Sequence, residues 1–99
     1  MNAKPTTTAL DMDVWGGDLD EDRKYRAQVR AASLGLEPCE RCGRGIVAGR
    51  GWWVEVTGGG GLVVLAGASV DTEDRGYMGH YLLGAECAKR VPLAYRRQA

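Results

Sequence analysis

The stretch CERCGRG at positions 39–45 carries two of the three cysteines in this 99-residue chain. Two residues separate Cys39 from Cys42, a spacing at which both thiolates can bind one tetrahedral metal ion. Cys87 and His80, the only other cysteine and the only histidine, lie far along the chain. We therefore predict one structural Zn²⁺ ion held by these four side chains. If His80 is not a ligand, an acidic side chain or a water would take its place.

The composition favours such an ion, because the chain has little apolar material for a core. It contains 15 glycines and no phenylalanine. Ordering a chain of this length costs on the order of 100 kcal/mol of conformational entropy. A structural zinc site contributes roughly 10 to 16 kcal/mol of apparent binding free energy. The expected fold is one small, zinc-stabilised α+β domain.

The cysteines and the N-terminus bear on the cellular compartment. Three cysteines cannot all pair within one chain, and no basic segment followed by an apolar one opens the sequence. No apolar run approaches the roughly 18 residues of a membrane span. These features predict a protein of the reducing cytoplasm with no membrane contact.

Residues 1–17 are expected to form a mostly disordered, acidic leader, because they show no sustained periodicity. The formal net charge is zero, but acidic residues dominate the first 22 positions, where the only cation is Lys4. The acidic residues there are Asp11, Asp13, Asp18, Asp20, Glu21 and Asp22. Such a leader could fold over the basic remainder or could be a solvated tail. Trp15 could dock on the domain, on a partner or on the following helix.

Residues 18–36 are expected to form an N-terminal amphipathic helix, spanning residues 19–34 with Asp18 as N-cap. An apolar stripe at helical spacing should contact the core: Tyr25, Val29, Ala32 and Leu36. Cations occupy the rest of the helix surface: Arg23, Lys24, Arg26 and Arg30. They could track phosphates, or they could simply keep an exposed helix soluble.

Residues 37–99 are expected to form the zinc-binding module, with a basic C-terminal end. Two glycines flank Arg44 and favour a tight turn into a strand, which indicates a zinc knuckle rather than a redox Cys-x-x-Cys. The predicted strands cover residues 46–48, 52–57, 62–66 and 80–83. The glycine run 58–61 would close a hairpin, and a helix over 85–91 would carry Cys87 in its first turn.

Several catalytic and ligand-binding motifs are excluded. The glycine run 58–61 is not followed by Gly-Lys-Ser/Thr and joins strands, unlike a phosphate-binding loop. The acidic loop 69–79 lacks the ligand spacing of a calcium loop. A zinc deaminase requires a histidine upstream of its cysteine pair, and no histidine precedes Cys39. An HNH-type nuclease requires a histidine base besides its zinc ligands, and one histidine cannot serve as both. With four protein ligands the ion would have no open position, so we predict a non-enzymatic protein.

Two kinds of partner are compatible with the sequence. Trp53 lies on the opposite strand face from Trp52 and could anchor a protein interface, stack on a base or pack beneath the helix. The leading hypothesis is a protein partner that contacts the first helix and the hairpin. The alternative is nucleic acid, and no small-molecule substrate is expected. A nucleic acid would be contacted by basic residues: Arg23, Lys24, Arg26, Arg30, Arg44, Arg50, Lys89, Arg90, Arg96 and Arg97.

Three segments resemble a known group of proteins. They are CERCGR at 39–44, WVEV at 53–56 and GHYLLGAECAKR at 79–90. They look like the small zinc-binding accessory proteins of actinobacterial phages, and the resemblance covers residues 37–92. It implies a phage protein in the bacterial cytoplasm, with a host or phage protein as partner and the three cysteines as ligands. The order of knuckle, hairpin and helix is also similar to the treble-clef zinc fold, although treble clefs place their two late ligands closer together than His80 and Cys87.

Overall fold

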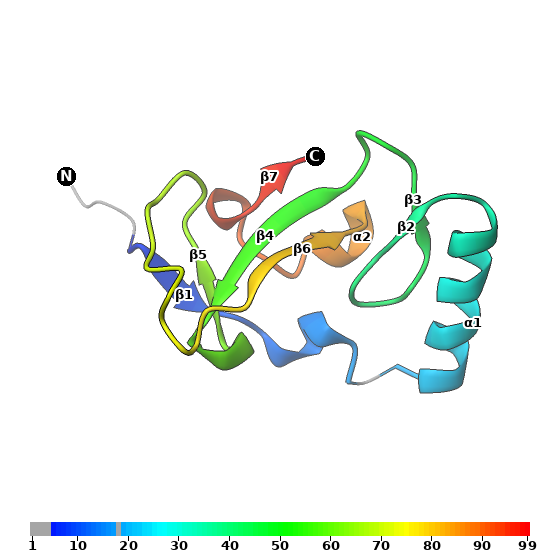
Figure 1. The fold of residues 1–99 in the computed structure, drawn as a ribbon, viewed down its shortest axis with the longest axis horizontal. Coiled ribbons are helices and arrows are strands. Elements are labelled where there is room, and N and C mark those ends of the chain that lie inside the picture. Colours follow the sequence, from blue (N-terminus) through cyan, green and yellow to red (C-terminus); the bar gives the residue numbers. More distant parts are fainter. Residues whose placement is uncertain (1–4, 18) are drawn as a thin grey trace.

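The computed structural model describes residues 5–17 and 19–99. An antiparallel sheet forms its body, and a helix with a two-stranded ribbon stands at one end (Figure 1). The elements follow the chain as β1 (Thr7–Ala9), η1 (Met12–Trp15), α1 (Glu21–Ser33), β2 (Glu37–Pro38), β3 (Gly45–Ile46), β4 (Trp52–Thr57), η2 (Gly58–Gly60), β5 (Leu62–Val64), β6 (Gly79–Leu83), α2 (Ala85–Ala88), η3 (Leu93–Tyr95) and β7 (Arg97–Gln98). The molecule is elongated, with extents of 45, 25 and 24 Å.

The centre of the sheet is β4. One of its edges pairs with β6, and its other edge pairs first with β7 and then with β5. The sheet continues from β5 to β1, and all these pairings are antiparallel. Because Thr57 pairs with Leu62, the glycine run 58–61 forms the four-residue turn of the predicted hairpin.

The core lies on one face of this sheet. Side chains alternate along β4, so Val54 and Val56 are fully buried while Trp53, just before Val54, is 39% exposed. Val63 of β5 and Leu83 of β6 extend the buried layer on the same side. The period of two that the sequence shows over 52–57 is therefore realised, with one tryptophan left partly in solvent.

The expected disorder of the leader, residues 1–17, is wrong for the segment Thr7–Trp15. Strand β1 adds an edge to the sheet, and Val14 of the 3₁₀ turn η1 is completely buried. The Trp15 indole N–H donates to the carbonyl of Gly60 at 2.9 Å, and its ring meets Tyr81 edge-on with centroids 5.2 Å apart. The first four residues lie outside the described part of the chain.

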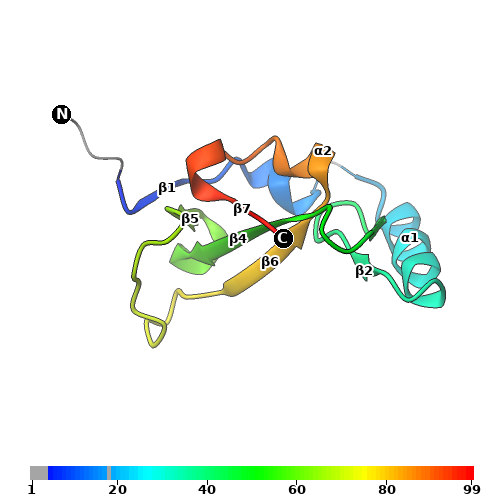
Figure 2. The same cartoon turned by 90° about the horizontal axis from the view of Figure 1, so that it is seen from above.

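Helix α1 begins later than expected. Its N-cap is Asp20, whose carboxylate accepts a hydrogen bond from the backbone N–H of Asp22. Asp18, the predicted cap, lies outside the described residues. The expected core contact of the apolar stripe is also wrong, since Tyr25 is 66% and Val29 51% exposed. The helix stands away from the sheet (Figure 2) and buries only Ala31, against the β2–β3 ribbon.

The C-terminal segment returns to the sheet. Helix α2 ends at Ala88, earlier than predicted. The N–H groups of Lys89 and Arg90 donate to carbonyls three residues earlier, as in a 3₁₀ turn, ahead of Pro92. Strand β7 then pairs with the start of β4, so the basic C-terminal end expected from the sequence is part of the sheet.

Candidate metal centre

The structure brings the three cysteines together. The Sγ atoms of Cys39, Cys42 and Cys87 all lie within 4.8 Å of one another, close enough to bind one metal ion. Cys39 and Cys87 are buried and Cys42 is half-buried. The pair comes from the turn between β2 and β3, and Cys87 comes from α2, so the site joins two segments that are remote in the sequence.

The turn that carries the first two cysteines has the hydrogen bonds of a closed loop. The N–H of Cys39 donates to the carbonyl of Arg44, and the N–H of Gly43 donates to the carbonyl of Cys39, both at 2.8 Å. Gly43 has a φ of +80°, a left-handed conformation that side chains disfavour. The Cys-x-x-Cys-Gly sequence therefore fixes the turn and directs both sulfurs to the same side.

Cys87 reaches the turn through the end of β6. The N–H of Glu40 donates to the carbonyl of Leu82 at 3.0 Å, which ties the turn to this strand. Gly84 follows at the N-terminus of α2, with its backbone beside the Cys39 side chain. The strand-to-helix turn at Gly84 therefore carries Cys87 back towards the other two cysteines.

The protein environment distinguishes the buried sulfurs. Burial alone would raise the pKa of Cys39, but the backbone N–H groups of Gly84, Cys42 and Arg41 hydrogen bond to its sulfur and leave the pKa below its ordinary value. Burial and the neighbouring charge of Cys39 raise the pKa of Cys87 to about 12. The turn thus favours the thiolate form of Cys39 more than water would, while Cys87 keeps its proton unless a cation displaces it.

A buried cation accompanies the sulfurs. Arg41 is 6% exposed, and its Nη1 lies 3.9 Å from the Cys87 Sγ. Its Nε donates to the carbonyl of Asp13 at 2.7 Å, so the ordered leader positions it. Burying a guanidinium is costly unless anionic or polar groups surround it. Sequence reasoning assigned Arg41 no role, and its place inside the Cys-x-x-Cys loop was the signal available.

His80, the predicted fourth ligand, is not in this group. It lies on β6 three residues before Leu83, whose side chain is in the core, and residues of opposite parity on a strand point to opposite faces. Its Nε2 is instead 3.6 Å from a carboxylate oxygen of Glu55 on the neighbouring strand. Within the described residues, the candidate metal group consists of the three cysteines alone.

The predicted partner-binding residues are spread over the molecule. Along α1, Arg23, Arg26 and Arg30 are exposed, and Lys24 is half-buried because its backbone lies against Gly43. Arg96 stacks over the Trp52 ring, 4.4 Å from its centroid. Trp53 and Arg97 are opposite each other in β4 and β7, on the face of the sheet away from the core.

Comparison with protein-family models, with curated proteins and with solved structures finds no match to this chain. Among the described residues, no helix has the length and apolar character needed to cross a membrane.

Proposed function

We propose that this chain is a non-enzymatic binding module whose fold is held by one structural Zn²⁺ ion. The observation that carries the proposal is the convergence of three cysteine sulfurs from the β2–β3 turn and from α2. Cysteine side chains that are only packing in a core have no need to share a 4.8 Å neighbourhood. The role we assign to the ion is to fasten the end of the molecule that carries α1 to the sheet.

The donor set favours zinc. Thiolates select soft or borderline ions, and zinc is the commonest one in tetrahedral structural sites. A tetrahedron with Zn–S bonds of about 2.3 Å needs sulfurs about 3.8 Å apart. The three sulfurs are already within reach of that spacing, so small rotations of their side chains would complete the arrangement.

Charge balance supports the same assignment. Three thiolates around a divalent cation leave one negative charge in a largely buried site, and the Arg41 guanidinium beside Cys87 offsets it. We propose a water molecule or a group from a partner as the fourth ligand, since the described histidine and carboxylates do not join the cluster.

Metal analysis of purified variants tests the zinc assignment. The unmodified protein should contain one zinc ion per chain, and Cys39→Ser and Cys87→Ser should each reduce that content severalfold. His80→Gln is the matched control, because it removes the predicted ligand that the structure places elsewhere. Full zinc content in Cys87→Ser, or loss of zinc in His80→Gln, would contradict the proposal.

The binding role rests on the surface of α1. Tyr25 and Val29 of α1 and its C-cap residue Leu34 are between 51% and 66% exposed. Exposed arginines lie on the same helix: Arg23, Arg26 and Arg30. Because these groups combine apolar area with positive charge, the partner we propose is a protein with an acidic, partly apolar surface. The phage resemblance would make it a host or phage protein of the bacterial cytoplasm.

Affinity capture from bacterial lysate tests this surface by comparison of variants. One specific protein should be retained by the unmodified chain and lost with the double variant Tyr25→Ser/Val29→Ser. Leu93→Ser is the matched control, since Leu93 is 66% exposed but lies beside the sheet. Equal capture by both variants would refute the assignment of α1.

A nucleic-acid partner is the second candidate, favoured by the exposure of the three arginines on α1. In that case, affinity for DNA or RNA should fall steeply with added salt, because phosphate contacts release counterions. The double variant Arg26→Gln/Arg30→Gln should make the affinity for DNA or RNA less dependent on salt. If the partner is an acidic protein instead, no salt-dependent affinity for nucleic acid should be measured.

A further inference from the structure

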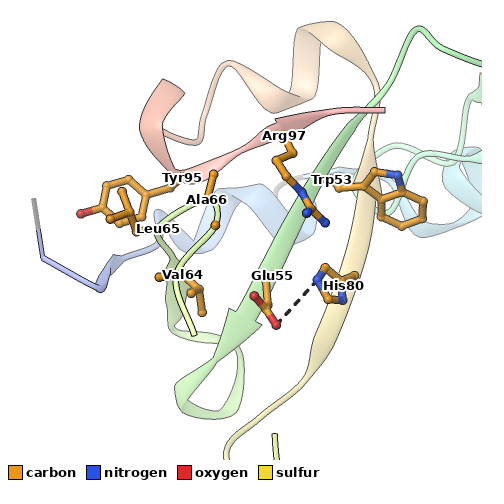
Figure 3. A pocket seen from close by; sticks show the side chains of 10 residues that line it. Trp53, Glu55, Val64, Leu65, Ala66, His80, Tyr95 and Arg97 are labelled. Atoms are coloured by element: carbon orange, nitrogen blue, oxygen red, sulfur yellow. Dashed lines mark ion pairs between the residues drawn. The ribbon is translucent and has the colours of Figure 1, made fainter. Parts of the chain in front are cut away.

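The face of the sheet opposite the core carries a second group of reactive side chains. Because β4 alternates, Trp53 and Glu55 project from this face. His80 of β6 is paired with Glu55, and Arg97 of β7 is paired with Trp53. Three strands thus bring an indole, a carboxylate, an imidazole and a guanidinium onto one surface (Figure 3).

These side chains line a cavity of about 220 Å³. The segment from Val64 to Ala68 and the ring of Tyr95 form the opposite wall. Figure 3 shows the Arg97 side chain extending over β4 from above, towards Glu55 and His80. Ligand pockets for drug-sized molecules have volumes of roughly 300 to 1,000 Å³, so this cavity can enclose only part of a ligand of that size.

The carboxylate in the cavity is fixed by its neighbours. The Tyr77 hydroxyl donates to Glu55 Oε2 at 2.7 Å, and His80 Nε2 is 3.6 Å from the same oxygen. This hydrogen bond to the carboxylate raises the pKa of Tyr77, which keeps its proton as a donor. Both contacts involve Oε2, so Oε1 is the oxygen positioned to accept hydrogen bonds from a ligand.

Arg97, His80 and Trp53 supply the other binding groups of the cavity. No ion pair forms at Arg97 among the described residues, although its guanidinium is beside the cavity. An anion placed between Arg97 and His80 would receive a charge-assisted hydrogen bond from the guanidinium and a hydrogen bond from the imidazole. Trp53, at the cavity edge and 39% exposed, offers a flat aromatic surface next to that anion position.

We propose that this cavity binds one nucleotide unit, a phosphate joined to a nucleobase. The phosphate contacts Arg97 and His80, and the base stacks on Trp53. Glu55 Oε1 accepts a hydrogen bond from a ribose hydroxyl or a base amino group. The unit is either a free nucleotide or part of a single strand, since both present the same chemistry. An acidic peptide would use the cations but not the combination of stacking surface and carboxylate.

Calorimetric titration of the zinc-replete protein tests the site. Adenosine 5′-monophosphate should bind saturably with a Kd below about 1 mM, and inorganic phosphate and adenosine should each bind at least about tenfold more weakly. Trp53→Ala and Arg97→Gln should each weaken the nucleotide about tenfold, and Trp53→Phe should retain most of the affinity. Tighter binding of pentaadenylate than of the monophosphate would identify a single strand as the source, and equal binding a free nucleotide.

Arg75→Gln is the matched control, since it removes the same charge from an exposed residue that does not line the cavity. It should change the nucleotide Kd by less than about twofold. The proposal is overturned if the nucleotide does not saturate the protein, if phosphate alone binds as well, or if Arg75→Gln weakens binding as much as Arg97→Gln. None of these variants alters a cysteine, so a negative result would leave the zinc assignment intact.

Discussion

Gly43 determines how closely α1 can approach the cysteine turn. Its φ is +80°, and a Cβ there would lie 2.5 Å from the backbone carbonyl oxygen of Lys24 and 2.9 Å from Gln28. A backbone atom cannot rotate away as the end of a side chain can. Any side chain at this position must therefore move the helix or distort the turn.

Replacing Gly43 with alanine should lower the free energy of unfolding by about 3 to 5 kcal/mol, the combined cost of a left-handed residue and of overpacking. Gly49→Ala is the matched control, because Gly49 has a φ of +81° but nothing lies near its Cβ position. That variant should cost only about 1 to 2 kcal/mol in urea denaturation. Equal costs would show that α1 does not pack on the turn.

Proton release should accompany metal binding, because Cys87 must lose its proton. Burial and the charge of Cys39 raise the pKa of Cys87 to about 12, so the thiol is neutral in the metal-free protein throughout the range from pH 6 to 8. The apparent affinity for Zn²⁺ should therefore rise at least about tenfold per pH unit as the pH increases. Chelator competition at pH 6, 7 and 8, corrected for protonation of the chelator, measures this slope. An affinity independent of pH would contradict thiolate ligation by Cys87.

The individual site residues differ in how well the sequence predicts them. Cys39 and Cys42 form a local motif, whose spacing and following glycine fix the turn regardless of the remaining fold. The position of His80 depends on which alternate residues of β6 face the core. Its tyrosine, leucine and glycine neighbours show no clear alternation of polar and apolar residues that would settle this. Arg41 acquires its role only when η1 folds against the turn, which no local pattern indicates.

At the scale of elements, the leader is the main difference between expectation and structure. Its order comes from two short pieces, a three-residue strand and a 3₁₀ turn, that bury Leu10 and Val14. The aspartates between these apolar residues hide the pattern in the sequence. Neither piece would be stable alone, so its structure depends on the sheet edge to which it is added.

Val14→Ala tests whether this segment is part of the fold. Val14 is fully buried, so the change should cost about 2 to 3 kcal/mol of unfolding free energy through lost burial and a cavity. The same substitution at Val29, which is 51% exposed on α1, should change stability by less than about 0.5 kcal/mol. A disordered leader would instead make Val14→Ala neutral in denaturant titrations.

Helix α1 shows why a correct period can indicate the wrong contact. Residues 21–33 are helical close to the predicted range, but the helix docks through Ala31, Gln28 and the backbone near Lys24. The opposing surface consists of Gly43 and Gly45, which accept small side chains and backbone rather than large apolar groups. The stripe containing Tyr25 and Val29 thus remains exposed to solvent.

At the scale of the whole molecule, two parts must be held together. The buried layer of the sheet continues into the β2–β3 ribbon through Ile46, whereas α1 meets the ribbon only through a small contact of mostly small residues. The three cysteines and the Glu40–Leu82 hydrogen bond lie at the junction. The α+β class, the hairpin and the cysteine cluster were within reach of sequence analysis, while the strand order required the long-range pairings of β1 and β7 with the sheet.

Thermal unfolding with and without a chelator tests the role of the ion most directly. Structural zinc contributes roughly 10 to 16 kcal/mol, as much as the entire stability of a typical small domain. Purified protein should therefore lose its cooperative calorimetric transition in excess chelator and regain it when one equivalent of Zn²⁺ is restored. An unchanged Tm in chelator, for protein that contains no stoichiometric metal, would contradict the account.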